Sequence, residues 1–356
     1  MSEQAKKYLS TAIKLALSGG LIGFLVYGAA NDKEFGQLVA GPKNWPLLIA
    51  AVPLCWLAVT ITIIRWNLLL RALGLSFTMG QTLRAGFLGY LANLLPFGLV
   101  AGDSLKAVML IHDNPRRKTE AVASVLVDRV VGLFALLLLA AIASWFLPTE
   151  HLARLADDDR LAIQRLSWVV RAAALISSFG LGVMLIPAIT RSRLWDLLEH
   201  MPLVGPILHK LVGAMRVYRQ RIDLLLVAIG VSLMVHLLYV GAIALMTQAI
   251  GIAPEHRPSV SSIFVIVPPS MIAGALPIGF YEVAITLLFR AASPAGAPAN
   301  MGLLVALGYR IIQICIAMTG VAYWLAGRSQ VEELVHEAEE QPPDEILEAE
   351  SAALRQ

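Results

Sequence analysis

The sequence predicts an all-α polytopic membrane protein with six full spans and two re-entrant broken-helix hairpins arranged in an inverted repeat. Composition gives the first indication: 58% of the residues are hydrophobic and 15% are charged, with a mean hydropathy of +0.71. Soluble domains are about 45–50% apolar and about 25% charged. The chain therefore holds more apolar surface than a water-soluble core can bury.

Six apolar stretches are each long enough to cross a bilayer, because about 20 helical residues at about 1.5 Å each span its hydrocarbon core. The first follows several lysines and resembles a signal peptide, but further apolar helices follow it, and we interpret it as an uncleaved span. The predicted spans are residues 11–30, 46–70, 120–147, 167–189, 224–250 and 301–326.

Two further apolar stretches, residues 81–111 and 259–289, are interrupted near their middles by proline and glycine. Irregular backbone at membrane depth is tolerated only inside protein or beside a water-filled cavity. We therefore expect each stretch to enter the membrane and return as two half-helices. The predicted breaks involve Pro96, Gly98 and Gly102 in the first stretch, and Pro277 and Gly279 in the second.

The two broken stretches match each other in spacing. Pro96 precedes Arg129 by 33 residues, and Pro277 precedes Arg310 by the same 33 residues. An acidic residue follows each proline, and the predicted topology gives the two copies opposite orientations in the membrane. Inverted repeats with broken helices are typical of secondary transporters, whose sites lie at the midplane. We expect repeat A over about residues 46–147 and repeat B over about 223–326.

Each repeat places an arginine near the bilayer centre, where it costs ~2.5–3.5 kcal/mol and needs a partner. Asp103 is the expected partner of Arg129, and Glu282 that of Arg310. Asp128 points about 100° away from Arg129 around the same helix and cannot easily pair with it. Two interpretations stay open here: the pairs lock the hairpins to the bundle, or they contact a substrate.

An anionic head group would fit this arrangement, because the guanidinium fork suits phosphate and free N–H groups begin each second half-helix. These half-helices are expected to begin near Gly102-Asp103-Ser104 and Gly279-Phe280-Tyr281. Helix capping alone would also explain Asp103 and Ser104. The candidate substrate-binding residues are Asp103, Ser104, Asp128, Arg129, Tyr281, Glu282 and Arg310.

The remaining polar residues have simpler interpretations. Arg65 and Lys106 are expected to extend to the cytoplasmic interface, and His236 to be a hydrogen-bonded structural histidine. Cys55 and Cys315 lie in apolar runs without the spacing of a metal site or a disulfide. We expect no catalytic residue, no metal and no cofactor.

Charge placement predicts the orientation. With the N-terminus inside, most lysines and arginines lie on the cytoplasmic side, as the positive-inside rule requires. The cytoplasmic side then carries an amphipathic segment over residues 191–222 and an acidic tail over residues 329–356. Both termini are expected to be cytoplasmic in a bacterial inner membrane.

Several motifs together resemble the lysylphosphatidylglycerol synthase transmembrane-region family. They are Leu94-Leu95-Pro96 through Gly102-Asp103-Ser104-Leu105-Lys106-Ala107, then the run from Ala121 to Asp128-Arg129, Pro268-Pro269-Ser270, and Leu276-Pro277-Ile278-Gly279-Phe280-Tyr281-Glu282. The likeness covers most of residues 10–328. It implies a flippase-like membrane domain over residues 1–328, with Asp103, Asp128, Arg129, Glu282 and Arg310 at the family's polar membrane positions. The soluble transferase domain of the synthase members is not part of the resemblance.

We therefore expect a flippase or transporter that moves a phospholipid or a polyprenyl-phosphate-type anionic amphiphile and catalyses no covalent reaction. Its partners would be the lipid substrate, the membrane and an unidentified protein of lipid synthesis, with no nucleic acid. No GxxxxGK[ST] loop for nucleotide occurs in the sequence. Two alternatives stay open: a membrane enzyme or accessory subunit of polyprenyl-phosphate or glycolipid synthesis, and a non-transporting scaffold.

Overall fold

The structure, a computed structural model, describes residue 27 and residues 33–94, 99–147, 149–153, 155, 157–186, 218–274, 279–294 and 297–327. Every regular element in these ranges is a helix. The first predicted span apart from Tyr27, most of segment 191–222, the acidic tail, and the break residues Pro96, Gly98 and Pro277 lie outside them.

Five of the described helices are long and apolar enough to cross a membrane. Four of them match predicted spans within about three residues, but α8 begins ten residues earlier than the predicted span 167–189. Its first turn holds Asp157, Asp158 and Asp159, and carboxylates stabilise the positive end of a helix. The five helices are α3 (Trp45–Ala72), α6 (Lys118–Ser144), α8 (Asp157–Leu185), α12 (Ile222–Ala249) and α15 (Met301–Ala326).

The first broken stretch forms two separate helices, α4 (Met79–Asn93) and α5 (Leu99–Asp113), which pack against each other. Gly102 lies against Gly89 and Asn93 near one end of the pair. At the other end, the Gln81 amide donates a 2.7 Å hydrogen bond to Asp113. The two helices therefore run antiparallel as a hairpin.

The second broken stretch also forms two packed helices, α13 (Val260–Ala273) and α14 (Phe280–Ala292). The hydroxyl of Ser259 caps α13 by accepting the N–H of Ser262 at 3.0 Å. Gly279 precedes α14 with a φ of 107°, a backbone conformation that glycine adopts without a steric penalty. Each predicted broken stretch is thus a pair of short helices and not one continuous helix.

Helices α3 and α12 pack side by side and run in opposite directions. The N–H of Asn44, just before α3, donates to the carbonyl of Ala249 at the end of α12. Near the other end of α3, the hydroxyl of Tyr218 donates to the carbonyl of Leu69. The helix that precedes the first hairpin is therefore antiparallel to the helix that precedes the second.

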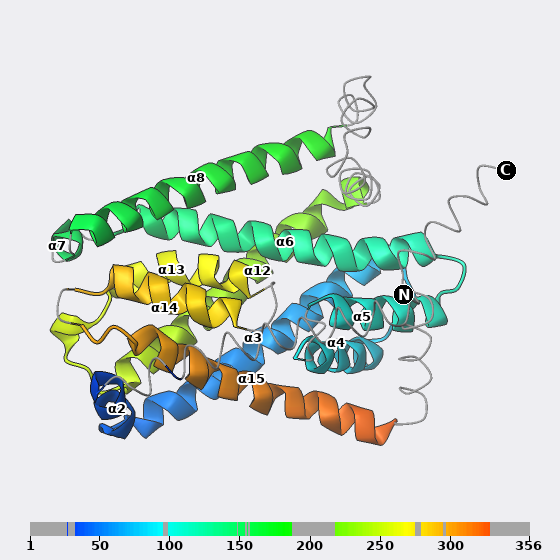
Figure 1. The fold of residues 1–356 in the computed structure, drawn as a ribbon. Helices are drawn as coiled ribbons and strands as arrows, with labels where there is room; N and C mark the ends of the chain where they lie inside the picture. Colours follow the sequence, from blue (N-terminus) through cyan, green and yellow to red (C-terminus); the bar gives the residue numbers. More distant parts are fainter. Residues whose placement is uncertain are drawn as a thin grey trace, which may run out of the picture.

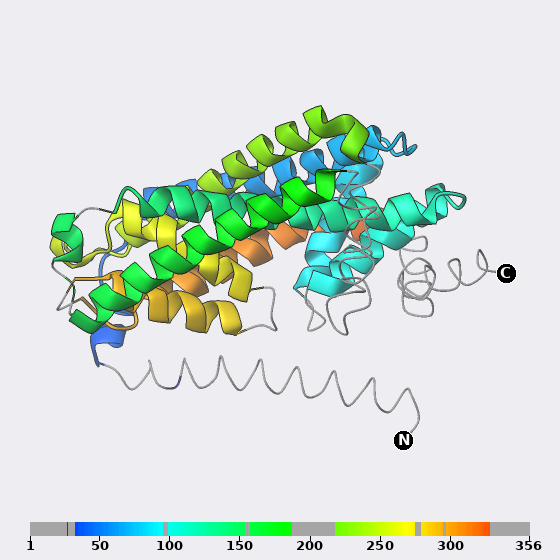
Figure 2. The same ribbon diagram turned by 90° about the horizontal axis from the view of Figure 1, so that it is seen from above.

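The two halves of the chain also exchange contacts in a matching way. Helix α6, which follows the first hairpin, packs on α13 of the second, and α15, which follows the second hairpin, packs on α4 of the first. The α13–α14 hairpin lies towards the end of the molecule that holds α2 (Lys33–Ala40) and α7 (Thr149–Leu152), and the α4–α5 hairpin lies towards the opposite end (Figures 1 and 2).

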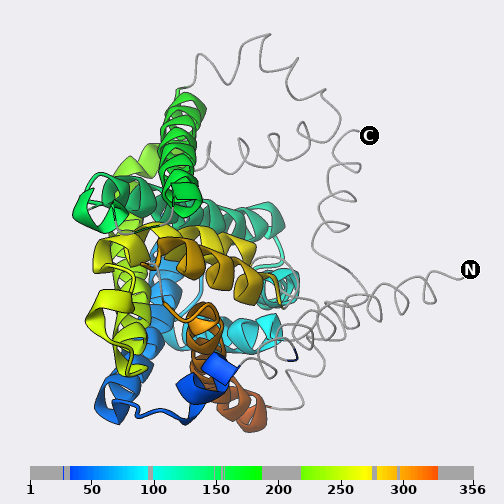
Figure 3. The same ribbon diagram turned by 60° about the vertical axis from the view of Figure 1, so that its left-hand side comes forward.

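Helix α8 lies outside this arrangement, against α6 and α14 (Figure 3). Its outward face carries exposed Trp168, Leu175, Ile176 and Phe179. A helix with so apolar an outer face needs an apolar surrounding, which the hydrocarbon core of a membrane supplies. Two short 3-10 helices, η1 (Arg219–Arg221) and η2 (Pro254–His256), complete the described elements.

Candidate functional site

The first polar centre is an ion pair between α5 and α6. The guanidinium of Arg129 binds the carboxylate of Asp103 through both oxygens, with Nε donating at 2.7 Å and Nη2 at 2.6 Å. The side chains are partly exposed, 38% for Arg129 and 22% for Asp103. The predicted pairing is present, and Arg129 keeps surface available to another anion.

Lys106 adds a second positive charge to this centre. Its ammonium lies 4.0 Å from Asp103 and 5.5 Å from the centre of the Trp66 ring. The expectation that Lys106 extends to the interface is wrong, because one helical turn places it beside Asp103 and against an aromatic face. Two basic side chains beside one carboxylate give the centre a formal net charge of +1.

The second polar centre joins α14 to α15. Arg310 Nε donates to Glu282 at 2.9 Å, and Glu282 is 1% exposed against 24% for Arg310. The other carboxylate oxygen of Glu282 accepts the N–H of Gly279 at 3.0 Å and so caps α14. Glu282 is therefore fixed by its own helix start, and the predicted partner of Arg310 is again present.

The two centres are built alike. In each, a carboxylate from the second helix of a hairpin binds an arginine on the long helix that follows. The centres differ in charge, because Asp103 has Lys106 as a second cation nearby, whereas the salt bridges of the second centre within the described ranges join only Glu282 and Arg310.

Asp128 does not bind Arg129 and instead forms a third, fully buried ion pair with Arg65. Arg65 Nε donates to Asp128 at 2.9 Å, and Arg65 Nη1 donates to the hydroxyl of Ser232 at 2.7 Å. The side chains of Arg65 and Asp128 are 5% and 7% exposed. The expectation that Arg65 extends to the interface is wrong, since its charge is satisfied by α6 and α12 inside the bundle.

The predicted start of the second half-helix is wrong for the first hairpin. Helix α5 begins at Leu99, so Asp103 and Ser104 lie within its second turn and do not cap it. Asn93, at the end of α4, supplies a cap from outside by accepting the N–H of Gly102 at 3.2 Å. For the second hairpin, the predicted start at Gly279-Phe280 matches the structure.

Four tyrosines from four helices lie in or against the same hydrophobic core, and we call them the tyrosine cluster: Tyr90 on α4, Tyr239 on α12, Tyr281 on α14 and Tyr309 on α15. The ring of Tyr309 lies 5.5 Å from that of Tyr281 and 6.4 Å from that of Tyr239, centre to centre. Of these residues, only Tyr281 was a candidate from the sequence. Single tyrosines on separate apolar helices carry no spacing signal, so the cluster could not be predicted.

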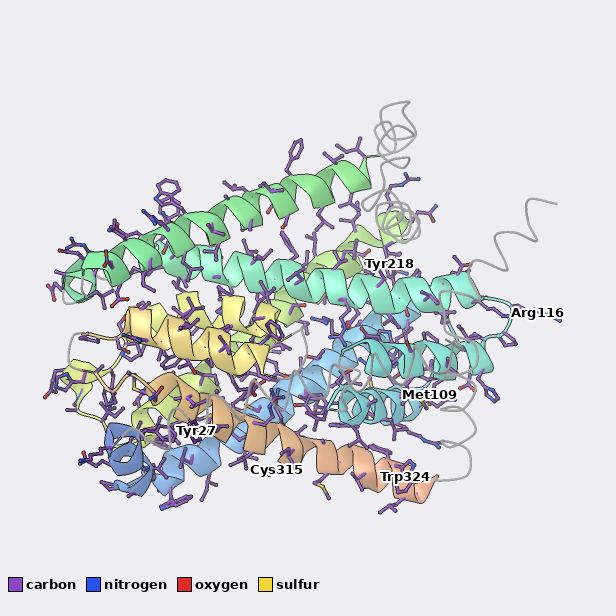
Figure 4. All side chains as sticks on the ribbon, viewed as in Figure 1. Tyr27, Met109, Arg116, Tyr218, Cys315 and Trp324 are labelled. Atoms are coloured by element: carbon purple, nitrogen blue, oxygen red, sulfur yellow. The ribbon has the colours of Figure 1, made fainter. Side chains whose placement is uncertain are left out.

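His236 is hydrogen-bonded, as the sequence interpretation expected, with Nε2 lying 2.9 Å from the carbonyl of Gly132. Ser104 is partly buried and makes no hydrogen bond within the described ranges. No group of three or more His, Cys, Asp or Glu side chains gathers in the described residues as a metal site would require. Cys315 points outward from α15 (Figure 4).

Five apolar helices of spanning length define a multi-pass membrane protein. Comparison with family models then identifies the family of this protein. The model of the lysylphosphatidylglycerol synthase TM region matches residues 11–320, and the chain belongs to that family, as its motifs predicted. No curated protein and no solved structure matches the chain.

Proposed function

We propose that this protein moves an anionic lipid, a phospholipid or a polyprenyl phosphate, across the bacterial inner membrane without chemical change. The observation that carries the proposal is the pair of equivalent centres, Asp103–Arg129 and Glu282–Arg310, on hairpins from opposite ends of the molecule. The lipid head group would displace the carboxylate from an arginine and bind in its place. The acyl or prenyl chains of the lipid would stay in the surrounding hydrocarbon.

The arrangement of the helices supports an inverted repeat. Helices α3 and α12 hold equivalent places in the two halves and run antiparallel, and the α6–α13 contact has its counterpart in the α15–α4 contact. A two-fold axis in the membrane plane would produce these relations. The hairpins α4–α5 and α13–α14 would then be re-entrant, open to opposite sides, and alternate access would follow from one half rocking against the other.

The charges fit an anion better than a cation. The five titratable side chains of the two centres, Asp103, Lys106, Arg129, Glu282 and Arg310, carry a formal net charge of +1. A guanidinium presents a rigid planar fork of donors that matches two phosphate oxygens, whereas an ammonium acts as a point charge. Because 38% of the Arg129 side chain is exposed, a phosphate could reach it without unfolding the hairpin.

Basic residues support the proposed orientation. Arg116 lies in the turn between α5 and α6, at the end of the molecule that holds the α4–α5 hairpin (Figure 4). Arg117, in the same turn, donates to the carbonyls of Leu73 and Gly74 after α3. Lysine and arginine gather on cytoplasmic loops, so this end would be cytoplasmic and the α13–α14 hairpin would open outwards.

A translocation assay tests the proposal. Purified protein in liposomes should speed the transbilayer movement of fluorescent phospholipids or polyprenyl phosphates. Arg129→Gln and Arg310→Lys should lower the rate at least about tenfold, the effect of losing one charge-assisted hydrogen bond to phosphate. The lysine variant keeps a charge beside Glu282 and loses only the fork, so it should remain folded on size-exclusion chromatography.

Arg160→Gln is the matched control, because Arg160 forms an exposed ion pair with Asp157 at the start of α8. It should move lipid at the wild-type rate. Wild-type protein that moves no lipid faster than empty liposomes, with and without a proton gradient, would contradict the proposal and leave the scaffold as the better account.

A further inference from the structure

The tyrosine cluster combines residues from both halves of the chain. Tyr90 stands on α4 of the first hairpin, and the ring of Tyr239 on α12 packs against that of Tyr309 on α15. Tyr309 precedes Arg310 in sequence and Tyr281 precedes Glu282, so both tyrosines stand on the helices that form the second centre. A head group bound at the second centre would therefore lie close to these rings.

One hydroxyl of the cluster has an unmet hydrogen bond. Tyr281 is 5% exposed, and its hydroxyl group is buried with no hydrogen-bond partner among the described residues. Buried polar groups in folded proteins are nearly always paired, because an unpaired one loses its hydration without compensation. A ligand that brings its own hydroxyl groups would satisfy it.

We propose that the tyrosine cluster binds the uncharged, hydroxyl-rich part of the lipid head group, a polyol or a sugar, while its phosphate lies at Arg129 or Arg310. Tyrosine suits this ligand, because its ring packs on carbon–hydrogen faces and its hydroxyl both donates and accepts. The inference rests on the proposed lipid substrate and adds its chemical class, a phosphodiester with a polyhydroxyl substituent.

Other occupants fit less well. A phosphate gains more from the arginines than from neutral phenols. An ammonium group would meet a net positive charge from the flanking side chains. An acyl chain would leave the Tyr281 hydroxyl unpaired. Ligand sites in general combine aromatic surface with a few placed polar groups, as this cluster does.

The test compares lipids that share their phosphate and their chains and differ in whether the phosphate carries a hydroxyl-rich substituent. Native mass spectrometry of the full chain would measure binding from equimolar mixtures of phosphatidylglycerol and phosphatidylethanol with identical acyl chains. A second mixture would hold a hexosyl phosphate ester of a polyprenol and its methyl phosphate ester. Wild type should prefer the hydroxyl-rich member of at least one pair about fivefold, the value of one neutral hydrogen bond.

The lipid pair that shows the preference identifies the class of lipid that supplies the hydroxyl-rich group, a glycerophospholipid or a glycosylated polyprenyl phosphate. Tyr281→Phe should lose the preference and still bind both members. Tyr323→Phe is the matched control, because Tyr323 stacks on Phe87 at 6.1 Å outside the cluster. It should keep the wild-type ratio.

Stability gives an independent readout. Because the Tyr281 hydroxyl is unpaired in the described structure, Tyr281→Phe without lipid should melt at or above the wild-type temperature. A clear fall would reveal a structural partner and overturn the inference, as would equal binding of both members of each pair or an unchanged preference in Tyr281→Phe. A protein that shows the preference but moves no lipid would keep this inference and remove the proposed function.

Discussion

Arg65→Ala should be the most destabilising removal of an arginine from this bundle. Arg65 and Asp128 are 5% and 7% exposed, and Arg65 also donates to Ser232. Removing the guanidinium leaves a buried carboxylate without its counter-charge, which costs about 3–5 kcal/mol. At roughly 2 °C per kcal/mol for a long chain, the melting temperature should fall by about 6–10 °C.

The comparison with Arg129→Ala makes this prediction specific. Asp103 is 22% exposed and keeps Lys106 at 4.0 Å when Arg129 is removed, so the melting temperature should fall by less than half as much. Thermal unfolding in detergent, followed by intrinsic fluorescence, measures both variants. Equal falls, or a larger fall for Arg129→Ala, would refute the assignment of Arg65 to a buried structural pair.

A double variant separates the charge from the packing. Replacing both partners, as Arg65→Leu with Asp128→Leu, removes the two buried charges together, and such replacements are often neutral or stabilising. The double variant should therefore melt above the single Arg65→Ala variant. If the double variant is the less stable of the two, the loss comes from packing and not from an unpaired charge.

Two further variants test the hairpins. Gly102→Ala should disrupt the α4–α5 packing and lower the melting temperature by several degrees, because a methyl group there would lie 2.2 Å from the carbonyl oxygen of Gly89. Gly180→Ala is its control, because nothing lies within 4 Å of the added methyl group. It should not lower the melting temperature, since alanine is favoured over glycine inside a helix. Glu282→Gln should lower both thermal stability and the rate of translocation, because the carboxylate pairs with Arg310 and also caps α14. A melting temperature equal to that of the wild type would contradict this dual role.

The sequence alone predicted the features that rest on apolar length and on local spacing. The apolar runs placed four long helices within about three residues, and the proline–glycine breaks placed the helix pairs α4–α5 and α13–α14. The match between the two broken stretches led to the correct partners of Arg129 and Arg310. Each acid lies on the hairpin helix that directly precedes the long helix of its arginine.

Features that depend on contacts between residues far apart in the chain could not be predicted from the sequence. Arg65 pairs with a residue 63 positions away and with Ser232, which is 167 positions away, and a helix end nearby made a solvent-facing arginine the simpler interpretation. The Gly-Asp-Ser run resembled a helix cap, but α5 begins at Leu99, and Asn93 of the neighbouring helix accepts the N–H of Gly102. The domain limits, the orientation and the substrate contacts of the seven candidate residues stay predictions.

The central claim is that the two hairpins open to opposite sides of the membrane, and cysteine accessibility tests it most directly. The test uses a protein whose Cys55 and Cys315 are replaced by serine. Single cysteines are then introduced at Ser104 or Phe280, which are both partly buried. Each variant is treated with a membrane-impermeant thiol reagent in right-side-out and in inverted vesicles. Ser104→Cys should react preferentially from the cytoplasmic side and Phe280→Cys from the outer side. Reaction of both cysteines from the same side would contradict the inverted arrangement and the translocation mechanism built on it.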